Sequence, residues 1–283
     1  MKTKNAMQLK VLINNRAKSA RVSPQLMLQN YMLERLIDCI SRSAWREHII
    51  VKGGMLIGSL IGVDRRTTKD LDTTVMGIPL THDKAAEVFA DICAIDAGDD
   101  LVFQLLRTED IREIDEYPGI RVFLRALYET LAVPLSIDVT TGDRITPSAI
   151  NYEYPFVFDE GTACIRAYPL ETVLAEKIET VLVRNVATTR IRDFYDIYEL
   201  WRVKRGAVDV GVLREALAAT CKRRNSSGSV ERCDESICAM RADVGLGRQW
   251  DTYVSKHSYA AEVSFLETLD TLQEIMRAMA TLV

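Results

Sequence analysis

The most constraining feature of the sequence is a short β-branched run that ends at two adjacent glycines. Residues His48–Lys52 favour a strand, and Met55–Leu60 favour a helix entered from the Gly53-Gly54 turn. Leu71–Val75 is typical of a second strand. This order of elements within so few residues predicts a mixed α/β region in the first half of the chain.

The rest of the chain changes character near residue 146. Ser23 and Pro24 predict the start of a helix, with Ser23 as its N-cap. Up to residue 146 the patterns predict a further helix over 83–93 and strands over 101–106, 120–127 and 135–140. Beyond it they predict a loop with Tyr154-Pro155 and Tyr168-Pro169, helices over 170–182, 190–203, 212–220 and 260–281, and a polar loop over 222–229. We therefore expect an α/β domain over residues 1–146 and a mainly helical domain over 147–283.

The charge balance excludes a protein that binds nucleic acid through its bulk charge. The chain has 36 Lys and Arg against 40 Asp and Glu, a net charge of −4, whereas such binders are strongly basic. Any contact with RNA would need a local basic patch. Two such groups are present, one of Arg16, Lys18 and Arg21 and one of Lys222, Arg223 and Arg224.

The sequence also disfavours a membrane protein and a protein with a cysteine-ligated metal site. No apolar run approaches the roughly 20 residues of a membrane span, and no apolar segment follows the first residues as in a secretory signal. The six cysteines form no C-x-x-C pair, and there are only three histidines. We expect reduced thiols and a cytoplasmic protein without a membrane partner.

Three aspartates supply the most chemistry. Asp70 and Asp72 are two residues apart, so a strand would place both carboxylates on one face with Leu71 in the core. Two such carboxylates repel each other unless a cation lies between them, which favours Mg²⁺. If the strand of Asp138 is a neighbour, three carboxylates meet, as phosphoryl or nucleotidyl transfer requires. Taken singly, a pair of glycines is more typical of an ordinary turn, an Asp-x-Asp spacing of a solvated strand face, and Asp138 of an exposed edge strand.

The complete set of motifs resembles a known family. It comprises Lys52-Gly53-Gly54, Arg66-x-Thr68-x-Asp70-Leu71-Asp72, Ile137-Asp138-Val139, Ala175-Glu176-Lys177 and Arg190-x-Arg192-Asp193-Phe194-Tyr195-Asp196. The order resembles the polymerase-β-type nucleotidyltransferase superfamily. The fuller string is similar to the AbiEii/AbiGii-type toxin family, which includes the mycobacterial MenT-type toxins. The similarity covers residues 52–200.

The resemblance implies a fold and roles for individual residues. The fold class would be α+β, with a nucleotidyltransferase-type mixed sheet followed by a mainly helical part that contributes to the same cleft. Asp70 and Asp72 would hold Mg²⁺ or Mn²⁺, and Asp138 would act as a base or a further metal ligand. The nucleotide would be bound by Lys52, Gly53, Gly54, Arg66, Thr68, Arg190 and Arg192. Lys177 and either Asp193 or Asp196 would complete the catalytic set.

Residue patterns in the helical part leave alternatives open. Lys177 shares the helical phase of the apolar positions, so it is either a lysine that extends to the surface or a cation that faces phosphate. Arg192 and Asp196 have the spacing of a surface salt-bridge ladder, and the sequence does not decide between Asp193 and Asp196. The chain departs from the family pattern at Met55, where a small Thr is usual, and at Arg192, where Lys is usual.

The leading hypothesis is therefore an Mg²⁺-dependent nucleotidyltransferase that is the toxin of a toxin–antitoxin pair. It would transfer NMP from an NTP, with the 3′ end of tRNA as the acceptor that the resemblance implies. Its antitoxin would be encoded by a neighbouring gene. The alternatives are a nucleotidyltransferase that modifies a small molecule or a protein, and a non-catalytic nucleotide-binding protein on the same scaffold.

Overall fold

The computed structural model describes residues 5–96, 100–111 and 119–281. The chain divides into two compact units. Unit 1 comprises Met1–Asp143 and Ala149–Tyr168, and unit 2 comprises Arg144–Ser148 and Pro169–Val283. The chain thus leaves unit 1 after Asp143, returns at Ala149 for two further strands, and leaves it again after Tyr168.

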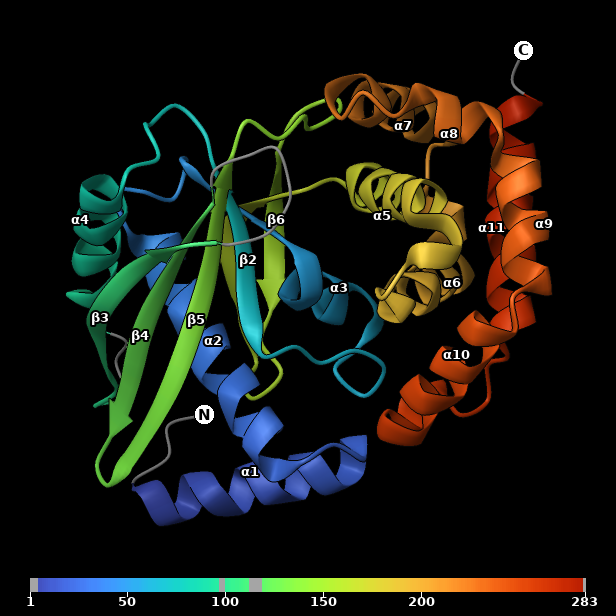
Figure 1. The fold of residues 1–283 in the computed structure, drawn as a ribbon. Coiled ribbons are helices and arrows are strands. Elements are labelled where there is room, and N and C mark those ends of the chain that lie inside the picture. The colour runs from blue at the N-terminus through green and yellow to red at the C-terminus, as the bar shows by residue number, and fades with distance from the viewer. Residues whose placement is uncertain (1–4, 97–99, 112–118, 282–283) are drawn as a thin grey trace. The chain divides into compact units, whose positions relative to one another are not determined.

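Unit 1 is built on a seven-stranded mixed sheet of order β3-β4-β5-β2-β1-β7-β6 (Figure 1). The strands are β1 (Ile49–Lys52), β2 (Asp70–Val75), β3 (Val102–Asp110), β4 (Ile120–Tyr128), β5 (Leu131–Thr141), β6 (Ile150–Pro155) and β7 (Thr162–Ala167). The pairs β2–β5 and β1–β7 are parallel, and the other neighbours are antiparallel. With the helical unit 2, this sheet confirms the predicted α+β class.

The prediction of a loop over the segment that holds β6 and β7 was wrong. β6 is an edge strand on which Tyr154 alone is buried, so its sequence lacks the alternation that identifies a half-buried strand. β7 does alternate, but its buried positions are Ala163, Ile165 and Ala167, and alanine is a weak strand former. β7 is stabilised by pairing with β1 and β6 by pairing with β7, and a local pattern does not report such pairing.

Four helices accompany the sheet: α1 (Ala6–Ala20), α2 (Pro24–Arg42), α3 (Gly53–Ile61) and α4 (His82–Cys93). α2 begins as predicted, because the Ser23 hydroxyl accepts a hydrogen bond from the Leu26 amide at 3.2 Å and Pro24 is the first helical residue. α2 packs on β5 and β7, and α4 packs on β3 and β4. α3 connects β1 directly to the segment before β2, and this connection places the glycine turn beside the acidic strand.

The secondary structure of unit 2 is entirely helical among its described residues, with connecting segments between the helices and the non-helical Arg144–Ser148. Its helices are α5 (Leu170–Arg184), α6 (Ile191–Lys204), α7 (Val210–Arg223), α8 (Ser227–Glu231), α9 (Cys233–Ala242), α10 (Val244–Lys256) and α11 (Phe265–Ala280). The polar stretch 222–229 was predicted as a loop, but α7 extends into it and α8 begins within it. α11 begins later than predicted, at Phe265, where Ser264 and Glu267 form a capping box.

Candidate active site

Four charged residues occupy neighbouring positions on β1, β2, β5 and β4. Lys52 is the register partner of Asp72, Asp72 is the partner of Asp138, and Asp138 is the partner of Arg121. We call these four residues the charge row. Adjacent strands lie about 4.8 Å apart, so the row places two carboxylates side by side between two cations. The prediction that the strands of Asp72 and Asp138 are neighbours is confirmed.

Asp70 lies on the same strand as Asp72. Leu71 between them is completely buried, whereas both aspartates are partly exposed. This alternation confirms that the two carboxylates share one face of β2. The face therefore holds Asp70 together with the two carboxylates of the charge row.

The glycine turn lies directly against this face. Gly53 has a φ of +63°, and a Cβ atom there would lie 1.9 Å from the Asp72 Oδ2 atom. A Cβ atom on Gly54 would lie 2.6 Å from the Cβ of Thr68. The Gly54 amide donates a hydrogen bond to Asp72 Oδ2 at 3.3 Å. Glycine is therefore required at position 53 by backbone conformation and close approach, and at position 54 by close approach.

The segment before β2 is held in place by buried polar groups. The Thr68 hydroxyl donates to Asp70 Oδ1 at 2.6 Å, and the Asn30 side chain of α2 donates to the Thr68 carbonyl at 2.6 Å. The Arg66 guanidinium donates to the Thr67 carbonyl. Thr68 and Arg66 were predicted to bind nucleotide, and in the structure both are buried in the framework that orients Asp70.

Arg121 is a residue of the site that the sequence analysis did not identify. Its guanidinium forms a two-pronged ion pair with Asp138, with Nε 2.6 Å from Oδ1 and Nη2 2.7 Å from Oδ2. Both carboxylate oxygens are thus engaged by one fork, the strongest geometry for this pair of groups. No spacing in the sequence links the two residues, because the contact arises from the register of β4 on β5.

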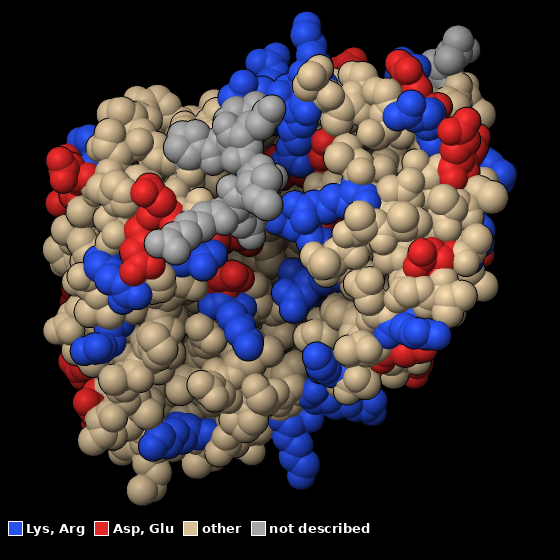
Figure 2. Space-filling view, in the orientation of Figure 1, with Lys and Arg blue, Asp and Glu red and all other residues tan. Residues whose placement is uncertain are grey.

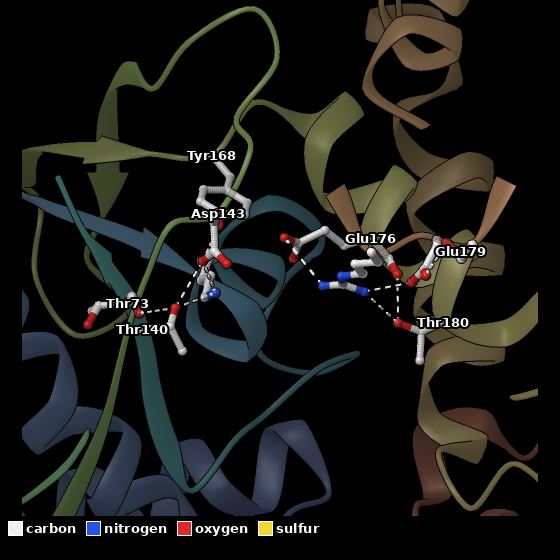
Figure 3. Close-up of polar contacts among 10 residues, drawn as sticks. Thr73, Thr140, Asp143, Tyr168, Glu176, Glu179 and Thr180 are labelled. Atoms are coloured by element: carbon white, nitrogen blue, oxygen red, sulfur yellow. Dashed lines mark hydrogen bonds and ion pairs between the residues drawn. The ribbon is translucent and has the colours of Figure 1, made fainter. Parts of the chain in front are cut away.

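Lys52 is held by a polar cluster at the end of β5. Its ammonium lies 2.5 Å from Asp143 Oδ2 and 2.9 Å from the Thr140 hydroxyl. The Tyr168 hydroxyl donates to the same Asp143 oxygen at 2.8 Å (Figure 3). Burial opposes ionisation of Asp143, but the charge of Lys52 and the hydrogen bonds from Lys52, Tyr168 and Thr140 outweigh it and hold the pKa of Asp143 below its ordinary value. Asp143 is a second site residue that the sequence analysis missed.

The environment of Asp72 disfavours its negative charge. Burial raises the pKa of Asp72, and the nearby charges of Asp70 and Asp138 raise it further. Lys52 and the hydrogen bond from the Gly54 amide act in the opposite direction without reversing the shift. The site therefore favours the neutral form of Asp72 more than water does.

The carboxylates provide a donor set that suits a divalent cation. Asp70 and Asp72 offer hard oxygen ligands that repel each other, and such ligands are preferred by Mg²⁺. In the ranges 5–96, 100–111 and 119–281, no group of three His, Cys, Asp or Glu side chains is arranged to hold a metal ion. The third nearby carboxylate, Asp138, is paired with Arg121. The residues present fit a cation at Asp70 and Asp72, and the charge of Arg121 on Asp138 opposes a cation at the third carboxylate.

In unit 2, Lys177 of α5 is paired with both aspartates of α6. Its ammonium contacts Asp193, and it lies 2.8 Å from Asp196 Oδ2. The side chain of Asp196 is fully buried, and that of Lys177 is only 15% exposed. The alternatives of a surface salt-bridge ladder at Asp196 and of a lysine that extends into solvent are therefore wrong. Two carboxylates compensate the cost of burying one ammonium.

The two arginines predicted to bind nucleotide flank the start of α6. Arg190 directly precedes the helix, Arg192 lies in its first turn, and both side chains are half-buried. The Arg190 amide donates to the Thr188 hydroxyl at 3.1 Å. The N-terminal end of α6 thus combines two guanidinium groups with the positive end of the helix dipole, a combination that suits anions.

One residue of the predicted RNA patch has a different use in the structure. Arg224 donates to Glu179 Oε2 at 2.7 Å and lies 3.7 Å from Glu176, and Ser226 donates to the other Glu179 oxygen (Figure 3). Glu179 is buried, so Arg224 compensates its charge within unit 2. Lys and Arg side chains are interspersed with Asp and Glu over the viewed face of unit 1, at the left of Figure 2, as the near-balanced composition leads one to expect.

Comparison with known proteins gives one family and several similar structures, among them two from Helicobacter pylori. The model of the family described as "Nucleotidyl transferase AbiEii toxin, Type IV TA system" matches residues 35–274. A Helicobacter pylori structure with a provisional nucleotidyltransferase assignment has a TM-score of 0.52 at 14% identity, and the match covers 93% of this chain and 99% of that one. JHP933 from Helicobacter pylori has a TM-score of 0.53 at 14% identity, with 92% and 95% covered. At this identity the likeness concerns the fold alone. None of the proteins with curated descriptions matches the chain.

No helix within the described parts of the chain is both long enough and apolar enough to cross a membrane.

Proposed function

This chain belongs to the AbiEii family of nucleotidyltransferase toxins of type IV toxin–antitoxin systems, and from that premise we propose that it transfers NMP from an NTP to the 3′ end of tRNA in a reaction that depends on Mg²⁺ or Mn²⁺. The observation that carries the proposal is the side-by-side placement of Asp72 and Asp138 with the Gly53-Gly54 turn against Asp72. The family is one of enzymes, so we set aside the non-catalytic alternative. It also implies an antitoxin partner, which we propose is encoded by a neighbouring gene.

In the proposed reaction an acceptor hydroxyl attacks the α-phosphate of the NTP, and the bond to pyrophosphate breaks. Asp138 would accept the proton of the attacking hydroxyl once its carboxylate is free. The backbone at the Gly53-Gly54 turn, which opens α3, would bind phosphate oxygens through the positive end of the helix dipole. Lys52 would add a positive charge next to Asp72. A divalent cation held by Asp70 and Asp72 would neutralise phosphate charge.

For unit 2 we propose that Lys177 supplies the cation that stabilises charge in the transition state. Asp193 and Asp196 would then be positioning residues, because they fix its ammonium. Arg190 and Arg192 would bind phosphate oxygens, and an arginine at the latter position can do so with two parallel hydrogen bonds.

The test is transfer of label from each of the four α-labelled NTPs to total tRNA, with Mg²⁺ and with chelator. We expect transfer from at least one NTP and its loss in Asp70→Asn and Asp72→Asn. Asp251→Asn, which alters an exposed aspartate of α10, is the matched control and should retain activity. Loss of transfer in the control, or undiminished transfer in both site variants, would refute the role of the acidic face.

The acceptor is a separate question. The net charge of −4 and the internal use of Arg224 both reduce the basic surface available for RNA, and these observations favour a protein or small-molecule acceptor as the second candidate. Incubation with labelled NTP and a cell extract, followed by separation of RNA, protein and small molecules, distinguishes the candidates. Label in protein or small molecules alone would exclude tRNA as the acceptor.

A further inference from the structure

The state of Asp138 in the structure bears on how the site acquires a cation. Its register partner Asp72 and the neighbouring Asp70 both contribute negative charge to the same face. A third carboxylate there would strengthen cation binding, because hard divalent ions gain affinity from each added carboxylate oxygen. Both oxygens of Asp138, however, are bound by the Arg121 fork at 2.6 and 2.7 Å.

The Arg121 fork takes a lone pair of each Asp138 oxygen, and its positive charge repels a second cation at the same carboxylate. Arg121 is 39% exposed and Asp138 is 17% exposed, so the arginine can leave toward solvent while the aspartate keeps its place on β5. An ion pair with one partner this exposed is of modest strength, although the fork geometry makes it stronger than a single contact. The pair is thus stable enough to form and weak enough to be exchanged.

We propose that Arg121 competes with the divalent cation for Asp138 and thereby regulates occupancy of the metal site. With Arg121 on Asp138, the site has only the carboxylates of β2. When Arg121 is displaced, Asp138 becomes the third ligand or the free base. The significance of this competition for turnover rests on the proposed function. The competition itself is a property of the charge row and is measurable without any nucleotide.

The test is Mn²⁺ binding to the metal-free full-length chain, followed by calorimetry and by the electron paramagnetic resonance signal of free Mn²⁺. In Arg121→Gln we expect affinity to rise about three- to tenfold, the range for loss of a partly exposed two-pronged pair. Arg121→Lys keeps the positive charge without the two-pronged geometry, so its affinity for Mn²⁺ should lie between those of the wild type and Arg121→Gln. Arg125→Gln is the matched control, because Arg125 lies four residues along β4, is exposed and pairs in register with Pro134.

A second pair of variants identifies the route of the effect. In an Asp138→Asn background, Arg121→Gln should give no gain in Mn²⁺ affinity, because the carboxylate in competition is already absent. Unchanged or weaker binding in Arg121→Gln would overturn the proposal, and so would an equal gain in Arg125→Gln or a gain that persists with Asp138→Asn. Circular dichroism spectra that match the wild type show that the variants are folded.

The outcome is separable from that of the proposed function. If Arg121→Gln binds Mn²⁺ more tightly while the wild type transfers no label to any acceptor, the competition stands and the proposed reaction fails. If the wild type transfers label while Arg121→Gln does not change Mn²⁺ binding, the reaction stands and the competition fails. In an active enzyme, the Mg²⁺ concentration for half-maximal rate should fall in Arg121→Gln by the same factor as the Mn²⁺ dissociation constant.

Discussion

The substitution Glu34→Gln tests a buried carboxyl group that lies outside the charge row. Glu34 of α2 is 2% exposed, and its Oε2 atom accepts a hydrogen bond from the Val157 amide at 2.7 Å, which ties the turn between β6 and β7 to the helix. Burial raises the pKa of Glu34 from its ordinary 4.5 to about 7, although the Val157 and Phe158 amides and the neighbouring Arg35 lower it in part.

The sign of the effect follows from proton binding. Between pH 4.5 and pH 7 the folded protein holds a proton on Glu34 that the unfolded chain releases, so the free energy of unfolding falls as the pH rises through this window. Above it the loss is constant. From the two pKa values we calculate that the contribution of Glu34 changes by about 2.5 kcal/mol between pH 5 and pH 8.5.

Glutamine keeps an oxygen for the Val157 amide and carries no charge at any pH. The assay is urea unfolding of the wild type and Glu34→Gln at pH 5 and pH 8.5. We expect the difference in unfolding free energy to shift by ~2.5 kcal/mol in favour of the variant at the higher pH. Any loss of stability from burying the NH₂ group of the glutamine side chain is the same at both pH values, so it cancels from this shift.

The control is Glu87→Gln. Glu87 is an exposed residue of α4 that pairs with Lys84 at 2.7 Å, and such pairs contribute little to stability. We expect its difference from the wild type to be nearly the same at both pH values. The reasoning would be refuted if the unfolding free energy of Glu34→Gln relative to the wild type did not change between the two pH values, or if it changed in favour of the variant at pH 5. Either result would show that Glu34 is charged in the folded state at pH 5.

Four further variants test the site and unit 2. Gly53→Ala should cost about 1–2 kcal/mol of stability from its left-handed backbone and, because its Cβ would clash with the carboxylate of β2, should lower nucleotidyl transfer at least tenfold. A transfer rate in this variant equal to that of the wild type would contradict the close approach of the glycine turn to the carboxylate of β2. Asp143→Asn should lower the same rate by about tenfold, because the lysine of the charge row loses its counter-charge, and Tyr168→Phe should lower it less; equal effects would disprove a charge-based role. Asp196→Asn should lower the urea-unfolding free energy by about 2 kcal/mol or more, because the lysine of α5 is left buried with less compensation, and a variant as stable as the wild type would contradict this.

Local periodicity in the sequence was sufficient to predict several helices and strands and part of the candidate site. Period-two alternation identified β2 and β5 and placed Asp70 and Asp72 on one face, because alternation is a property of the strand itself. The cap at Ser23 was equally local. The strands β6 and β7 escaped detection because one is a largely exposed edge and the other is rich in small residues, so their stability comes from the sheet they join.

The sequence by itself thus determined the glycine pair and the carboxylates of Asp70, Asp72 and Asp138, since residue type and spacing decide these, but it did not identify Asp143. The tertiary structure alone decided their partners. Arg121 reaches Asp138 through the register of β4 on β5, and Lys52 reaches Asp143 across 91 residues. The physical reason is that an ion pair depends on distances of a few ångströms between groups, and these distances are set by strand order and register rather than by separation along the chain.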